Sequence, residues 1–177
     1  MAANNSSHHV GNSSLEFKVA DDKREMEIPA KDLNIVWGKD PRYWKVPEDN
    51  KSAAELNQVY WLEVTGCVDK TRGDKIYEVG FHVSLTPDAF GWGDVPLYLM
   101  VKRGKDGKFV WKKFFMDHHT DDQGRCYITG KSTQAQNMGA QDSDVSKLYF
   151  GLYEVWSGKW KGGLKIHHAV IRELPST

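Results

Sequence analysis

The chain has 177 residues, and 24 lysines and arginines balance 24 aspartates and glutamates, so its formal net charge is zero. Because a neutral chain attracts neither nucleic acid nor an anionic lipid surface over a distance, we expect no nucleic-acid partner and no membrane insertion. The length suits a single domain. Two cysteines, Cys67 and Cys126, are too few for a disulfide scaffold and are predicted to be thiols.

The first 29 residues are predicted to form a tail. Residues 1–14 are rich in Asn, Ser and His, and residues 15–32 are charged with only scattered apolar positions. Such a segment buries too little apolar surface to offset its ordering entropy, so we expect disorder at least to residue 14 and one folded domain over residues 30–177. No basic region is followed by an apolar run at this end, which predicts a protein that remains in the cytoplasm.

The stretch LNIVWGKDPRYWKV, which begins at Leu33, cannot be one continuous helix or strand. Residues 33–37 form a predicted short strand, after which a Gly and an Asp-Pro pair force a loop. Trp37 and Trp44 therefore stand at the two ends of one turn. Their indole faces could offer flat platforms to the C–H face of a sugar ring, or both side chains could fill the end of the fold. The spacing alone does not decide between these two roles.

Alternation of apolar and polar residues with a period of two recurs along the rest of the chain. Asp106-Gly107 is a strong hairpin signal, and the one helical segment that we expect is a short turn over residues 52–57. About seven strands with no helical pattern between them predict an all-β fold, an antiparallel β-sandwich or a closed barrel. The segments that predict strands are 60–68, 77–85, 95–102, 108–116, 148–152 and 164–170.

Motifs for catalysis and for metal binding are weak. The chain has no glycine-rich phosphate loop, no nucleophile elbow and no Cys-x-x-Cys pair. Asp117-His118-His119 is the best metal candidate, but adjacent side chains on a loop seldom converge on one ion, so we expect no metal site and no cofactor. His167-His168 falls in the last predicted strand, where alternation would turn one ring inward to pack and the other outward.

Three blocks of the sequence, in order, carry a resemblance to a known family. They are AKDLNIVWGKDPRYWK, SAAELNQVYWLEVTGCV and LYFGLYEVWSGKWKGGLKIHHAVIREL. Together they resemble the phloem protein 2 family, the plant nucleocytoplasmic lectins related to Nictaba, the tobacco agglutinin, over residues 30–174. The resemblance implies a β-sandwich of the jelly-roll type that dimerises and binds N-acetylglucosamine oligomers, including chitin fragments and the core of N-glycans. It implies no enzymatic activity and no catalytic metal.

The resemblance also assigns site residues. It places the two binding-site tryptophans at Trp37 and Trp44, with Tyr43 in the same loop, and it places an acidic residue at Glu154. An ionised carboxylate suits that role, because it accepts strong hydrogen bonds from hydroxyl and amide groups. Alternation predicts that Glu154 emerges at the end of its strand beside an opening in the core. Trp160 is either a third wall of the site or a core residue.

The expected function is therefore that of a lectin whose ligands are N-acetylglucosamine oligosaccharides or glycoproteins. The resemblance implies a homodimer in the cytoplasm, with phloem sieve elements as one location; without a recognisable lysine-rich import run, nuclear entry is not expected. The alternative is a phloem structural or interaction protein that binds proteins or RNA and has a lost or weak sugar site. A small glycosidase that pairs Glu154 with Asp40 or Glu48 is a third hypothesis, which the resemblance does not support.

Overall fold

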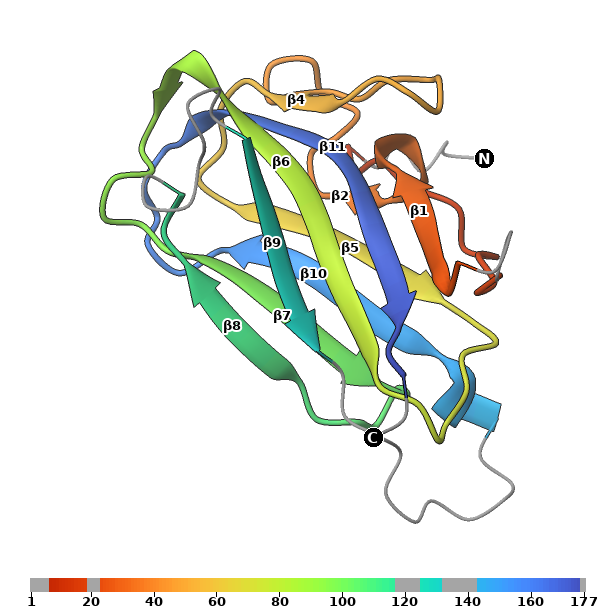
Figure 1. Cartoon of the computed structure of the whole chain (residues 1–177). Helices are drawn as coiled ribbons and strands as arrows, with labels where there is room; N and C mark the ends of the chain where they lie inside the picture. Colours follow the sequence, from red (N-terminus) through yellow and green to blue (C-terminus); the bar gives the residue numbers. More distant parts are fainter. Residues whose placement is uncertain (1–6, 19–22, 117–124, 132–142, 176–177) are drawn as a thin grey trace.

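The computed structural model describes residues 7–18, 23–116, 125–131 and 143–175. In these residues the chain forms two antiparallel sheets packed face to face, so the prediction of an all-β antiparallel sandwich is confirmed (Figure 1). The first sheet has the order β3(Trp44–Lys45), β4(Ala54–Leu56), β11(Gly162–Glu173), β6(Tyr77–Phe90) and β9(Arg125–Lys131), with β1(Glu25–Pro29) also paired to β11. The second has the order β2(Asn34–Ile35), β5(Leu62–Val68), β10(Leu148–Glu154), β7(Leu97–Arg103) and β8(Val110–Phe114). Two short 3-10 turns, η1(Ala30–Asp32) and η3(Ser143–Ser146), complete the described elements.

The core lies between the two sheets and follows the period of two that the sequence shows. In β5 every second residue from Leu62 to Val68 is buried, and the three residues that alternate with them are half-buried. Phe81 of β6 and Phe150 of β10 meet across the sandwich with ring centroids 5.9 Å apart. Each such side chain contributes about 1.5–3 kcal/mol when it leaves water. Alternation on both sheets therefore accounts for the sandwich.

Two local predictions have opposite outcomes. The hairpin at Asp106-Gly107 is confirmed, since β7 and β8 pair in antiparallel register on either side of it. The helical turn over residues 52–57 is wrong, because Ala54–Leu56 forms strand β4 between β3 and β11. Ala54 and Leu56 are buried on either side of a half-buried Glu55, which is the pattern of a strand.

The described part of the predicted tail belongs to the fold. β1 pairs with β11 along its whole length, and Ile28 is completely buried. Further upstream, the backbone N–H and C=O of His9 each bond to Ile35 at 2.9 Å. The described residues upstream of the predicted boundary at residue 30 are thus paired to the sandwich. Few apolar residues are needed here, because backbone pairing to β11 and β2 supplies the contacts.

Strand β11 departs from its expected alternation after Ile166. Ile166 pairs with Val83 and His168 pairs with His82, so the strand has a bulge between the two pairs. Ala169 and Ile171 consequently take the core positions, and both His167 and His168 are only half-buried. The prediction that one imidazole packs inward is wrong, because the extra residue of a bulge reverses the alternation that follows it.

Candidate functional site

The turn between β2 and β3 holds Trp37 in an unusual backbone conformation. Its φ is +65°, a left-handed value that residues other than glycine seldom adopt. Hydrogen bonds on both sides fix it: the Trp37 N–H donates to His8 Nδ1 at 3.1 Å, and the Asp40 N–H donates to the Trp37 carbonyl at 3.1 Å. Strain of this kind is found most often at binding and catalytic sites. The turn thus keeps the Trp37 indole half-buried beside Tyr43, with ring centroids 5.7 Å apart.

Trp44 lies in the core. It starts strand β3, pairs with Leu56, and is 2% exposed. Because neighbouring residues point to opposite sides of an extended chain, Tyr43 faces the loops and Trp44 faces the core. The predicted stacking role of Trp44 does not fit this geometry, since its indole has no open face to offer a ligand. Of the tryptophan pair, Trp37 alone lies at the surface cleft described next.

An aromatic cleft forms where three loops meet at one end of the sandwich. Trp37 and Tyr43 come from the first loop, Val59, Tyr60 and Trp61 from the segment between β4 and β5, and Trp160 from the segment between β10 and β11. We call these six residues the aromatic cleft; it encloses about 110 Å³. Tyr60 and Trp160 pack edge to face with centroids 5.2 Å apart, yet they remain 45% and 48% exposed. Trp61 is 39% exposed. Large aromatic surface is therefore open to solvent here.

The sequence left two interpretations of Trp160 open, a third wall of the site or a core residue, and the structure distinguishes them. Trp160 is a wall of the cleft and not a core residue. Its position depends on the backbone of the next residue, because Lys161 and Val59 exchange two backbone hydrogen bonds of 2.9 Å. This bridge brings the segment before β11 against the segment before β5. Trp160 and Tyr60 are placed on the same side of the cleft as a result.

Glu154 is buried and does not face the cleft. It is 2% exposed and forms an ion pair with Lys161, which is completely buried. Ser157 donates to the Glu154 carboxylate from its backbone N–H at 3.0 Å and from its hydroxyl at 2.8 Å. Burial opposes ionisation of Glu154, but the bonds from Lys161 and Ser157 outweigh it and hold the pKa of this carboxyl below its ordinary value. The predicted role of Glu154 as an anchor for sugar is therefore not supported, and neither is a glycosidase pair that includes it.

Lys161 completes this buried contact and ties it to the cleft. Its ammonium group donates to the carbonyl of Tyr60 at 3.2 Å and to the carbonyl of Lys159 at 2.9 Å. Glu154 and Lys161 thus hold together the two segments that carry Tyr60 and Trp160. Glu154, which the sequence analysis singled out, therefore positions the cleft through Lys161 and does not line it.

Glu63 is the carboxylate nearest the aromatic residues in sequence and was not predicted. A second depression of about 500 Å³ adjoins the cleft and is lined by Glu63 together with Trp37, Tyr60 and Trp61. The Trp61 indole N–H donates to Glu63 Oε2 at 2.9 Å. The signal was present in the sequence: Leu62 faces the core, so alternation turns Trp61 and Glu63 outward together.

The described part of the chain has neither a metal-binding cluster nor a membrane-spanning helix. Asp117-His118-His119 lies outside the described residues. Over residues 7–18, 23–116, 125–131 and 143–175, no group of three or more His, Cys, Asp or Glu side chains is arranged to hold a metal ion. Over the same ranges, no helix has the length and apolar character needed to cross a bilayer.

A β-sandwich whose loops hold an open aromatic cleft is organised as a binding domain. The family model described as Phloem protein 2 matches residues 23–173, and the chain therefore belongs to the phloem protein 2 family. It is 39% identical to Protein PHLOEM PROTEIN 2-LIKE A9 of Arabidopsis thaliana, over 98% of this chain and 100% of that protein.

Two further relatives are more distant. The chain is 32% identical to Protein PHLOEM PROTEIN 2-LIKE A1 of Arabidopsis thaliana, over 81% of this chain and 59% of that protein. It is 36% identical to a protein named Lectin from Luffa acutangula, over 36% of this chain and 34% of that protein. Of these three matches, the one to Protein PHLOEM PROTEIN 2-LIKE A9 covers nearly the whole of both chains.

Proposed function

We propose that the aromatic cleft binds carbohydrate and that its ligands are oligomers of N-acetylglucosamine. One observation carries the proposal: five aromatic side chains surround one shallow cleft, and three of them remain more than a third exposed. A monomeric domain normally leaves large aromatic rings exposed singly, and a group of them indicates a binding surface. A pyranose ring packs its C–H face on such rings without any need for charge, which suits a neutral chain. The similarity to a protein named Lectin supports the proposal.

The residues of the cleft and of the adjoining depression have different roles in binding. In this proposal Trp160, Tyr60 and Trp37 supply the faces for stacking, and Glu63 replaces Glu154 as the acceptor for hydroxyl or amide protons. A cleft of about 110 Å³ holds little more than part of one sugar ring, so binding of a single N-acetylglucosamine is expected to be weak. Longer oligomers would extend into the adjoining depression, where Trp61 and Glu63 lie.

The remaining features of the proposal follow the family. We propose that the chain acts as a homodimer, since two clefts on one particle raise the avidity for a polymer or a glycoprotein. We place it in the cytoplasm, including that of phloem sieve elements. Nothing positive among the described residues indicates a catalytic step at the cleft, and the proposal includes none.

The first prediction concerns Trp160. Trp160→Ala removes an exposed wall of the cleft, and we expect the affinity for the N-acetylglucosamine trimer to fall roughly thirtyfold, the effect of losing about 2 kcal/mol. The thermal midpoint should change little because the side chain is 48% exposed. Trp111→Ala is the matched control, since Trp111 is 61% exposed on β8 and does not line the cleft. Equal loss of binding in both variants, or in neither, would contradict the assignment of the cleft.

A further inference from the structure

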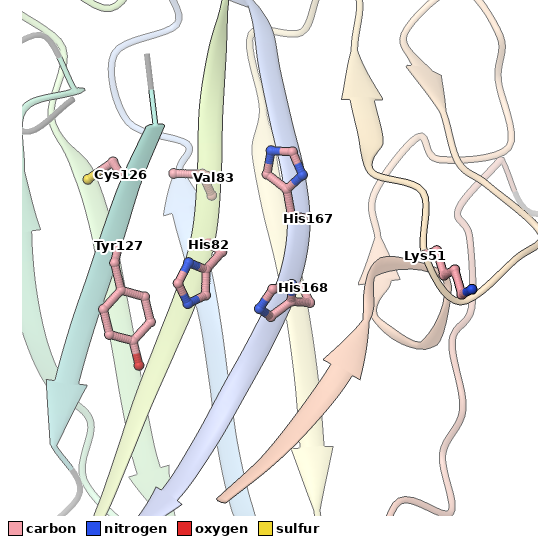
Figure 2. A pocket seen from close by; sticks show the side chains of 7 residues that line it. All are labelled: Lys51, His82, Val83, Cys126, Tyr127, His167 and His168. Atoms are coloured by element: carbon pink, nitrogen blue, oxygen red, sulfur yellow. The ribbon is translucent and has the colours of Figure 1, made fainter. Parts of the chain in front are cut away.

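A second hollow lies on the outer face of the first sheet, on different strands from the aromatic cleft. Figure 2 shows its side chains on three neighbouring strands, with one from the loop before β4. It has a volume of about 650 Å³, and its polar lining consists of three imidazoles, a phenol and an ammonium group. These belong to His82, His167, His168, Tyr127 and Lys51, and we call this set the histidine hollow.

The rings of the histidine hollow form a continuous row across the sheet. Tyr127 of β9 stacks on His82 of β6 with centroids 4.3 Å apart, and His82 lies 4.6 Å from the ring of His168 on β11. Gly80 makes room for this row, because a Cβ at that position would meet the Tyr127 ring at 2.4 Å. A larger residue at position 80 would displace the phenol, so the glycine is part of how the hollow is built.

The bulge in β11 brings a further imidazole to the same face. Regular alternation would have turned one ring of His167-His168 into the core, whereas the bulge leaves both lining the hollow. Ser84, only 8% exposed, fixes the second ring, with its hydroxyl 2.8 Å from His167 Nε2. Bulges recur beside binding and active sites because they re-aim side chains in this way.

Within the described residues, the lining of the hollow offers hydrogen-bond donors and includes no carboxylate. Several charges surround it, and most are already paired. On β1, Glu25 pairs with Arg172 of β11 at 2.8 Å, and Arg172 also meets Glu78 of β6 at 3.3 Å. Glu27 of β1 lies 3.7 Å from His168 and is the nearest opposing charge. Lys165 of β11, which pairs with Glu55 of β4 at 3.4 Å, adds positive charge beside His167.

We propose that the histidine hollow binds a tetrahedral oxyanion, such as a sulfate or phosphate group, between His82, His167 and Lys51. The imidazole N–H groups, the phenol and the ammonium group supply the donors that such a group requires. The proposal does not depend on sugar binding at the aromatic cleft.

The protonation of the imidazole rings makes the affinity of the site for an anion depend on pH. Burial lowers the pKa of His82 and of His167, and their neighbour His168 lowers both further. Both rings therefore remain largely neutral at the pH where a free imidazole is half charged, and they become charged at lower pH. A bound anion stabilises the charged rings, so binding takes up protons and tightens as the pH falls.

The test is calorimetric titration of the full chain with sodium sulfate at pH 5.5 and pH 7.5, at one fixed ionic strength. Sulfate keeps its charge across this range, so any change with pH reports the protein. We expect binding about tenfold tighter at pH 5.5, since uptake of one proton changes affinity by up to about tenfold per pH unit. The double variant His82→Gln, His167→Gln should lose at least tenfold in affinity at pH 5.5. His9→Gln removes an imidazole outside the hollow and should bind sulfate as the wild type does.

Two results would overturn the proposal: equal sulfate affinity at both pH values, or a double variant that binds sulfate as tightly as the wild type. An unchanged affinity of the double variant for the N-acetylglucosamine trimer, or an unchanged thermal midpoint, verifies that it is folded. A parallel titration with N-acetylglucosamine 6-sulfate identifies the source of the anion. Tighter binding than inorganic sulfate indicates an anionic glycan, and equal binding indicates the free anion.

Discussion

Trp44→Ala is expected to lower the free energy of unfolding by about 3–5 kcal/mol, the cost of deleting a large aromatic side chain from a packed core. Trp44 is 2% exposed and belongs to the main hydrophobic cluster. Urea denaturation followed by circular dichroism measures the effect. If Trp44 instead formed a stacking platform, the variant would remain stable and would lose only sugar binding.

Trp44→Phe separates volume from hydrogen bonding. The indole Nε1 of Trp44 is buried and has no hydrogen-bond partner among the described residues. Phenylalanine keeps much of the apolar volume and removes the buried N–H, whose desolvation costs about 1–3 kcal/mol. The loss of stability in Trp44→Phe should therefore be well below that in Trp44→Ala. Equal losses would mean that the N–H contributes a hydrogen bond.

Lys161→Met is expected to destabilise the fold by about 3–5 kcal/mol, because it leaves the Glu154 carboxylate buried without its partner. The same variant should weaken binding of the N-acetylglucosamine trimer, since Lys161 also bonds to the Tyr60 carbonyl behind the cleft. Both effects can be measured on one preparation by denaturation and by calorimetric titration.

Two variants control for charge and for pairing. The double variant Glu154→Gln, Lys161→Met removes both buried charges and should recover much of the lost stability. Lys165→Met breaks the exposed pair with Glu55 and should cost less than about 1 kcal/mol. A Lys161→Met variant as stable as Lys165→Met would refute the structural role of the buried pair.

Acid should weaken the buried ion pair between Glu154 and Lys161. The pKa of Glu154 in the folded chain is below its ordinary value of 4.5, so this carboxylate contributes stability that is present above about pH 4.5 and is lost as the pH falls through the folded pKa. We expect the thermal midpoint of the wild type to fall more steeply between pH 5 and pH 3 than that of the Glu154→Gln, Lys161→Met variant. Parallel curves for the two proteins would contradict this.

The sheets of the sandwich could be predicted because alternation is a local property of the chain. The apolar faces of β5, β6 and β10 appear directly in the sequence as a period of two. Where the chain leaves that pattern, prediction failed for identifiable reasons. β4 has three residues, too few for periodicity to separate a strand from a turn. The bulge in β11 adds one residue and leaves both His167 and His168 on the outer face, where regular alternation predicts only one of them.

The candidate site was likewise predictable from the sequence only in part. Trp37 and Trp160 could be singled out as unusual residues, and the structure places both at one cleft. Tyr43 lines the cleft and Trp44 lies in the core because β3 starts between them. The spacing of residues in the sequence does not reveal where that strand starts. The resemblance assigned the acidic role to Glu154, and the sequence does not show that this side chain is buried. Only the contact with Lys161, which depends on how two distant loops meet, distinguishes Glu154 from Glu63.

Calorimetric titration of the full chain with the N-acetylglucosamine trimer, with tryptophan fluorescence recorded alongside, tests sugar binding at the aromatic cleft most directly. We expect saturable binding with a change in emission, because Trp37, Trp61 and Trp160 line the cleft and its adjoining depression. No heat and no change in emission at millimolar trimer would contradict the proposal. That result would favour the alternative hypothesis, in which this protein binds protein or RNA partners.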